Sequence, residues 1–101
     1  MRVSCGEKKR EGGKLVKACV QVEGGEVVGI LLTGDFFVEP EEAVDRLVGE
    51  LSALRAPLEM APEAVLEAVR RSGARLIGVG DEEIREAVRR AISSEAPGRV
   101  A

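Results

Sequence analysis

Residues 14–33, KLVKACVQVEGGEVVGILLT, decide the fold because they predict two strands joined by a tight turn. Apolar and polar side chains alternate over residues 14–22, as in a strand with one buried face. Gly24 and Gly25 then supply the positive φ values that a tight hairpin turn needs. The partner strand is expected over residues 27–33, so a β-hairpin is predicted at the centre of the domain.

The partner strand departs from simple alternation. It carries apolar groups on both faces, contributed by Val27, Val28, Ile30, Leu31 and Leu32. Gly29 interrupts this run and indicates a β-bulge. A strand that is apolar on both sides needs cover on both sides, and helices can cover one of them. Two alternatives stay open for the other face: an interface with another chain, with Val28 and Leu31 facing that partner, or a terminal segment of this chain folded over it.

Three helices are predicted after the hairpin. The first begins at Pro40, where the missing N–H costs nothing, and stops at residues 55–57. The second covers residues 62–72, and the third follows Asp81 as its N-cap. A short run at residues 75–79 is a candidate third strand. This order predicts an α+β fold, in which a small antiparallel sheet (the hairpin plus that candidate strand) has about three helices packed on one face.

Charge is unevenly distributed along a chain that, at 101 residues, is one domain long. Residues 1–17 carry six bases against two acids, whereas the whole chain has a net charge of −3. Residues 1–11 are predicted to form a polar, irregular basic arm, and residues 93–101 a flexible tail. A basic arm can contact a phosphate or an acidic protein face, and the plainer interpretation is a solvated terminus.

The chain contains no His, Trp or Tyr, and its only two aromatic residues, Phe36 and Phe37, are adjacent. Without His, a Ser–His–Asp or Cys–His mechanism within this chain is excluded, and we predict no catalytic residue. The lack of aromatic stacking platforms and the net negative charge argue against nucleic-acid binding. No apolar leader or membrane-length apolar run is seen, so we expect no membrane contact and a cytoplasmic location.

Cys5 and Cys19 are fourteen positions apart, without CxxC spacing or a His partner, so no metal site is predicted. One disulfide is arithmetically possible. The missing leader nevertheless favours the reducing cytoplasm, with Cys19 as a small residue in a strand and Cys5 as a bystander.

Two short motifs are the most distinctive in the sequence: Gly12-Gly13-Lys14 before the hairpin and Gly34-Asp35-Phe36-Phe37 after it. Antiparallel pairing brings them to the same end of the sheet, where we expect one composite surface. The first motif lacks P-loop spacing, so the pattern alone gives weak support for a phosphate cradle. In the second motif, one Phe can fill the core while the other stays near the surface as an anchor for a partner.

These two motifs, together with Glu23-Gly24-Gly25-Glu26-Val27 and Pro40-Glu41-Glu42, resemble the C-terminal accessory domain of lipoate–protein ligases. The resemblance is greatest to the separately encoded small subunit of archaeal bipartite ligases. It covers roughly residues 8–92, including a late helix pattern that runs from Gly78-Val79 to Ala91-Ile92. A sequence that lacks Asn and is rich in Arg and Glu also fits a thermophilic source.

The resemblance implies a non-catalytic accessory subunit. In that family a large catalytic subunit binds lipoate, ATP and Mg, forms lipoyl-AMP and transfers the lipoyl group to a lysine of an acceptor domain. The small domain is required for the activation step. The expected partners are therefore the large subunit, in a heterodimer, and indirectly the lipoyl-acceptor domain, with no cofactor bound by this chain alone. The resemblance also implies a fold similar to that of sulfur-transfer and iron–sulfur scaffold proteins.

On this interpretation the composite surface docks beside the adenylate pocket of the large subunit. Lys14 approaches a phosphate or a partner carboxylate, and Asp35 holds that end of the hairpin. The expected site residues are Gly12, Gly13, Lys14, Gly34, Asp35, Phe36 and Phe37, with Val28 and Leu31 as further partner-facing residues.

Gly29 and Leu31 stand where the family has polar or basic residues, which indicates a more apolar partner interface or a homo-oligomer. Two alternatives of other classes stay open. One is a sulfur-transfer or iron–sulfur scaffold-like protein that uses Cys5 and Cys19, and the other is a simple dimerising interaction module.

Overall fold

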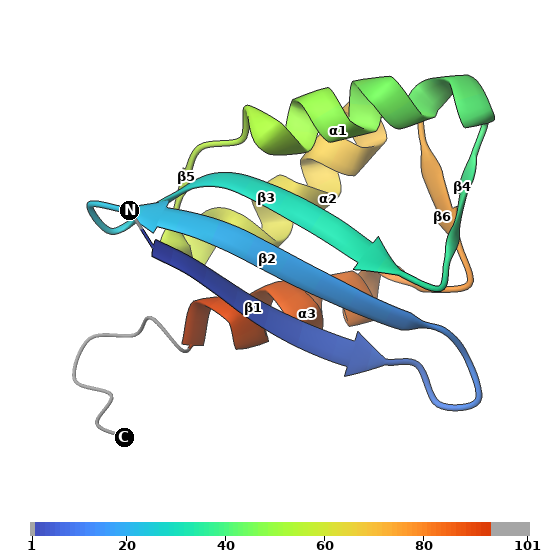
Figure 1. Cartoon of the computed structure of the whole chain (residues 1–101), viewed down its shortest axis with the longest axis horizontal. Coiled ribbons are helices and arrows are strands. Elements are labelled where there is room, and N and C mark those ends of the chain that lie inside the picture. The colour runs from blue at the N-terminus through green and yellow to red at the C-terminus, as the bar shows by residue number, and fades with distance from the viewer. Residues whose placement is uncertain (1, 94–101) are drawn as a thin grey trace.

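The computed structural model describes residues 2–93. The elements follow in the order β1 (Arg2–Lys9), β2 (Leu15–Glu23), β3 (Glu26–Gly34), β4 (Phe37–Glu39), η1 (Glu41–Ala43), α1 (Val44–Ser52), β5 (Ala56–Pro57), η2 (Leu58–Met60), α2 (Ala61–Ser72), β6 (Arg75–Ile77) and α3 (Asp81–Ser93). Four strands form one antiparallel sheet in the order β1-β2-β3-β5, and β4 pairs with β6 in a second sheet. With three helices packed against the larger sheet (Figure 1), the predicted α+β fold is confirmed.

Strands β2 and β3 form the predicted hairpin. Gly24 and Gly25 make its turn, with φ values of 60° and 81° that favour glycine. The two strands pair antiparallel along their length. The register shifts between Val20 and Val22, opposite Gly29, so the predicted bulge is confirmed.

The prediction of an irregular arm over residues 1–11 is wrong, because Arg2–Lys9 form β1 at the edge of the sheet. The inward positions of this strand are Ser4 and Gly6, which carry no apolar signal in the sequence. The Ser4 hydroxyl donates to the Ala91 carbonyl of α3 at 2.7 Å. Gly6 lies so close to α3 that a Cβ there would stand 2.3 Å from Ala91 N. These small residues let α3 pack directly onto β1.

The predicted helices are present with small shifts. The first starts as the 3₁₀ turn η1 after Pro40 and continues as α1. Helix α2 ends at Gly73, whose φ of 78° makes it a left-handed C-cap. Helix α3 includes Asp81 as its first residue and extends through Ser93. The rest of the predicted tail, 94–101, lies outside the described residues. Among the residues that are described, no helix is long and apolar enough to cross a membrane.

Residues Arg75–Ile77 form a strand, β6, but not within the hairpin's sheet. β6 pairs with β4, with Phe37 opposite Ile77 and Glu39 opposite Arg75. The prediction that this run extends the hairpin is therefore wrong, and β1 and β5 complete the larger sheet instead. A strand of only three residues is too short for its local pattern to specify a partner.

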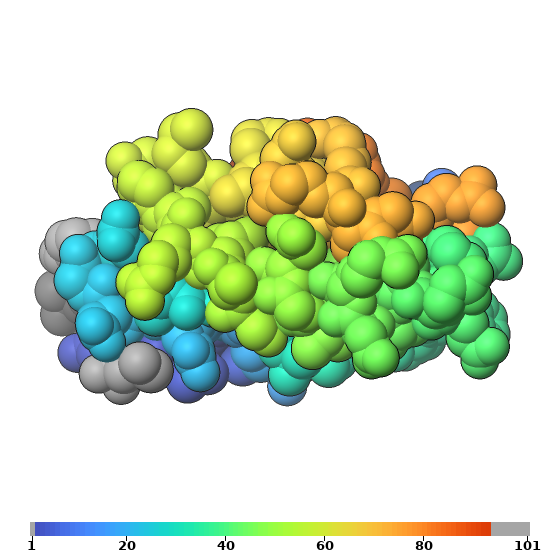
Figure 2. All heavy atoms as spheres, turned by 90° about the horizontal axis from the view of Figure 1, so that it is seen from above, coloured from blue at the N-terminus to red at the C-terminus, as the bar shows by residue number. Residues whose placement is uncertain are grey.

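The helices lie on one side of the larger sheet (Figure 1). Figure 2 looks onto α1 and shows the hairpin on one side of that helix and α2 with β6 on the other. The largest fully buried side chains of this layered core include Val16, Val20, Val27, Val65 and Val88. On the opposite face of the sheet, Val3 is 64% exposed and Leu31 is 55% exposed. The N-terminal segment thus extends the sheet and leaves these two side chains uncovered.

Candidate functional site

The end of the hairpin where β2 begins and β3 ends is closed by Asp35. Its carboxylate oxygen Oδ2 accepts a hydrogen bond from the Leu15 N–H at 3.3 Å. The Asp35 N–H in turn donates to the Leu15 carbonyl at 3.1 Å. Gly34 has a φ of 151°, and a Cβ there would stand 2.1 Å from the Leu15 oxygen. Gly34 therefore permits the close approach, and Asp35 ties the two strands together.

The Gly12-Gly13 loop is a tight turn between β1 and β2. The Gly13 N–H donates to the Arg10 carbonyl at 2.7 Å, and the Arg10 N–H donates to the Lys14 carbonyl at 3.0 Å. Gly12 has a φ of 66°, in the left-handed region. Because the Gly13 N–H is bonded inside the turn, it is not directed at a ligand such as a phosphate. The contribution of this loop to the surface is to position Lys14.

Lys14 lies across the start of the second sheet. Its Nζ stands over the Phe37 ring, 5.7 Å from the ring centroid, which is within cation–π range. Its aliphatic stem passes Gly78, where a Cβ would stand 2.6 Å from Lys14 Cγ. The Phe37 side chain, 66% exposed, is paired across the strands with Ile77. The composite surface therefore includes Ile77 and Gly78, which the two motifs do not indicate.

The two Phe side chains diverge, with one in the core and one near the surface. Phe36 is half-buried and packs against the core, whereas Phe37 is exposed. Phe36 also lines an apolar groove of about 120 Å³ between β3 and α1, together with Leu31 and Val48. Of the expected partner-facing pair, Leu31 is exposed and Val28 is half-buried. The apolar surface thus extends from Phe36 along β3.

The two cysteines are joined. Cys5 and Cys19 face each other in the register of β1 and β2 and form a disulfide. The prediction that Cys5 is a bystander is therefore wrong, because Cys5 lies in β1, a strand that no apolar alternation marks in the sequence. With both sulfurs in one bond, neither is a free thiol for sulfur transfer or for an iron–sulfur cluster. Within residues 2–93 no group of three or more His, Cys, Asp or Glu could hold a metal ion.

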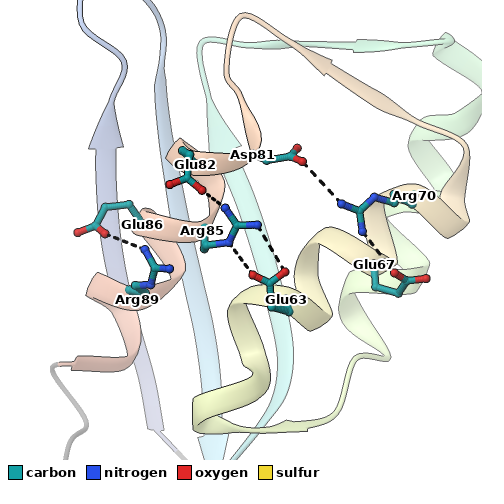
Figure 3. Close-up of polar contacts among 8 residues, drawn as sticks. All are labelled: Glu63, Glu67, Arg70, Asp81, Glu82, Arg85, Glu86 and Arg89. Carbon is teal, nitrogen blue, oxygen red and sulfur yellow. Dashed lines mark hydrogen bonds and ion pairs between the residues drawn. The ribbon is translucent and has the colours of Figure 1, made fainter.

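The densest charge cluster joins α2 to α3 (Figure 3). The Arg85 Nε donates to the Glu63 carboxylate at 2.6 Å, and the same guanidinium also pairs with Glu82. The hydrogen bond from Arg85 lowers the pKa of Glu63 and raises the pKa of Arg85. Arg70 reaches Asp81 at 3.7 Å. Because every group in the cluster is paired between or within the two helices, its role is to hold them together.

The composite surface has the chemistry of a binding site. It presents one cation, Lys14, beside one exposed ring, Phe37, while the Asp35 carboxylate is already bonded to the backbone. The surface is therefore suited to a partner that offers an anion next to apolar groups.

Comparison with known proteins identifies a similar fold. No protein-family model matches the chain, and no curated protein matches it. A solved structure of an archaeal lipoylation system, a bipartite lipoate protein ligase and its E2 lipoyl domain from Thermoplasma acidophilum, contains a similar chain. The TM-score is 0.64 at 24% sequence identity, and the match covers 87% of this chain and 96% of that chain. At this level of identity the likeness shows that the two chains share a fold.

Proposed function

We propose that this chain is the non-catalytic accessory subunit of a bipartite lipoate–protein ligase. It acts with a large catalytic subunit, which supplies the sites for lipoate, ATP and Mg, in the activation of lipoate to lipoyl-AMP. Protein lipoylation follows when the large subunit transfers the lipoyl group to an acceptor domain.

One observation carries this proposal. The Gly12-Gly13-Lys14 and Gly34-Asp35-Phe36-Phe37 motifs, on which the resemblance to ligase accessory domains rests, meet at one end of the hairpin through Asp35 and Lys14. The similar chain in the Thermoplasma acidophilum system is covered over 96% of its length, so it is comparable in size to this one. The match over nearly the whole of that chain supports a role in a lipoylation system, on which the accessory assignment builds.

Lys14 provides the charged contact of the proposed docking. Its ammonium group lies over an exposed ring, and none of the ion pairs found within residues 2–93 involves Lys14. A cation held in this way gains from contact with a phosphate or carboxylate on the large subunit, especially where the interface excludes water. Lys14, which belongs to the accessory chain, thus stabilises negative charge on the catalytic chain.

Apolar contact beside Lys14 and along β3 supplies the water exclusion. Phe37, Leu31 and Ile77 are 66%, 55% and 40% exposed, respectively, although all three are large apolar side chains. Burying such side chains at the centre of an interface is the main source of affinity between proteins. Closure of this surface over the large subunit would order its loops and keep water from the activated acyl group.

Reconstitution tests the proposal. The large subunit encoded in the same genome is mixed with this chain, and pyrophosphate release from ATP and lipoate is measured for each chain alone and for both together. We expect release only with both chains, together with their co-purification. Pyrophosphate release by this chain alone, or no increase over the large subunit alone, would contradict the proposal.

The Lys14→Ala variant tests the charged contact, with Lys9→Ala as its control. Both lysines flank the same loop, but Lys9 is exposed at the end of β1. We expect Lys14→Ala to lower the rate of adenylation about 10- to 100-fold, because a charge-assisted contact contributes about 1.5–3 kcal/mol. Lys9→Ala should retain the full rate. Equal rates for the two variants would remove Lys14 from the mechanism while leaving the accessory role intact.

A further inference from the structure

The Cys5–Cys19 disulfide lies on the face of the sheet that the helices leave open. Ser4 and Gly6, the neighbours of Cys5 in β1, point towards α3, so Cys5 itself points away from the helices. Cys5 is exposed and Cys19 is half-buried. A disulfide in this position can be reached from solvent, in contrast to one that is sealed in a core.

A cavity of about 270 Å³ adjoins the Cys19 side of this bond. Its walls include the apolar side chains of Val3 and Leu31, and Gln21 supplies one amide. Gly29 also lines it, and a Cβ there would stand 3.2 Å from both Gln21 Oε1 and the Ser52 carbonyl oxygen, so a side chain at this position would crowd that wall. The volume lies just below the range of pockets for drug-sized ligands, roughly 300–1,000 Å³, so the cavity suits a small, mostly aliphatic molecule.

We propose that Cys5 and Cys19 form a thiol–disulfide exchange site for a small dithiol that carries an aliphatic chain. The aliphatic chain packs against Val3 and Leu31, which brings a thiolate of the ligand to the sulfur of Cys19. The site lies at the Cys5–Cys19 pair of β1 and β2, away from Lys14 and Phe37, and it shares Leu31 with the apolar part of the docking surface.

The exchange balances without any further reactant. A thiolate of the dithiol attacks Cys19 Sγ, a mixed disulfide forms, and the Cys5–Cys19 bond breaks to release the Cys5 thiolate. The exposed position of Cys5 lets water solvate this leaving group and supply its proton. The second thiol of the ligand then attacks the ligand sulfur of the mixed disulfide, which closes a cyclic disulfide and releases Cys19. The ligand loses two electrons and two protons, and the protein gains both.

The reduced lipoyl group is a dithiol of this class, with two thiols on an aliphatic chain. Its identification as the natural ligand rests on the proposed function, whereas the exchange site itself rests on the cavity and the disulfide. The two can therefore be tested separately.

The test uses the full-length chain with its disulfide intact. Dihydrolipoamide, dithiothreitol or glutathione is added at equal thiolate concentration, and new thiols are counted by iodoacetamide labelling and mass spectrometry. We expect dihydrolipoamide to react about tenfold faster than dithiothreitol, the factor expected from burying roughly two methylene groups. Glutathione, with one thiol, should be slower still. Equal rates for dihydrolipoamide and dithiothreitol would overturn the proposal.

Two matched variants locate the binding. Leu31 and Met60 are each 55% exposed, but only Leu31 lines the cavity. Leu31→Ser should abolish the preference for dihydrolipoamide, and Met60→Ser should keep it. Loss of the preference in both variants, or in neither, would overturn the assignment of the cavity. Circular dichroism checks the fold of each variant, and the three reductants compared on the wild-type chain decide the question if Leu31→Ser does not fold.

Adenylation by the reconstituted complex separates the two proposals. Selective reduction without any stimulation of adenylation would overturn the accessory role and leave the exchange site standing. Stimulated adenylation with equal reduction rates would overturn the exchange site alone.

Discussion

The two faces of the central hairpin use their apolar side chains for different purposes. On the side of the helices, Val16 and Val20 are fully buried and Ile30 is 5% exposed. On the other side, Leu31 of β3 remains more than half exposed, as does Val3 of the neighbouring strand β1. The same strands thus carry the core on one face and a contact surface on the other. Apolar groups that stay in water contribute little to folding, and their retention is typical of surfaces that meet another molecule.

The adjacent residues Ile30 and Leu31 provide the strongest test of this difference. Ile30→Ala should lower the free energy of unfolding by about 2–5 kcal/mol, because it leaves a cavity in the core. Leu31→Ala should change it by no more than about 0.5 kcal/mol, because the side chain is largely in water. Urea denaturation followed by circular dichroism measures both. Similar losses for the two variants would mean that the open face also belongs to the core.

Affinity should show the reverse order. Binding of Leu31→Ala to the proposed large subunit, measured by calorimetry, should weaken about five- to tenfold, as expected for a truncated contact worth about 1 kcal/mol. Undiminished affinity would remove Leu31 from the docking surface.

On the open face of the sheet, the Cys5–Cys19 disulfide links β1 to β2 covalently. On the face towards the helices, the strands are held by packing of buried side chains. The disulfide closes a loop between positions fourteen residues apart. A double substitution, Cys5→Ser with Cys19→Ser, should therefore lower the free energy of unfolding by about 3 kcal/mol. Thermal unfolding with and without a reductant measures the effect. The reductant should destabilise the wild-type chain and leave the double variant unchanged, and a response in the double variant would point to another cause.

The hairpin could be predicted because its signals are local. Alternation over β2, the Gly24-Gly25 turn and the break at Gly29 are each visible within a few residues, and antiparallel register then places Lys14 near Asp35. The proximity of the two motifs follows from the register alone. The divergence of Phe36 and Phe37 follows from the period of an extended chain.

The missed elements depend on contacts between distant segments. The inward residues of β1 are Ser4 and Gly6, which are small enough to let α3 approach closely. Because neither residue is a large apolar one, no apolar pattern marks the strand. The disulfide was missed for the same reason, because the pairing of Cys5 depends on β1. Strands β4 and β6 are three residues long, and nothing local links Phe37 to Ile77. The position of Lys14 near Asp35 could therefore be predicted from the sequence, whereas its position beside Ile77 and Gly78 could not.

The contact between β1 and α3 gives a smaller and more local test of the packed face. A Cβ at Gly6 would stand 2.3 Å from Ala91 N, so Gly6→Ala must separate the strand from the helix. We expect the free energy of unfolding to fall by about 1–3 kcal/mol, the usual cost of overpacking.

Gly49 of α1 is the matched control, because a Cβ there meets nothing within 4 Å. Gly49→Ala should stabilise the chain by up to about 1 kcal/mol. A neutral Gly6→Ala would show that β1 is not held closely against α3.

The smallest expected effect concerns the ion pairs on the solvent side of the helical layer. The hydrogen bond from Arg85 lowers the pKa of Glu63 below its ordinary value of 4.5. Since the folded-state pKa is the lower one, the Glu63 carboxylate stabilises the fold above the unfolded-state pKa. This contribution is lost as the pH falls through the lowered pKa.

Arg85→Gln should raise the pKa of Glu63 towards 4.5, as measured by NMR titration of its side-chain carbons. Glu86 is the internal control, because the hydrogen bond from Arg90 is the main cause of its lowered pKa. The Glu86 pKa should stay low in the variant. An unchanged Glu63 pKa would mean that other charges hold it down. Because water screens this exposed pair between α2 and α3, the variant should lose far less stability than Ile30→Ala, so that packing against the hairpin contributes more to the fold than this charge pair does.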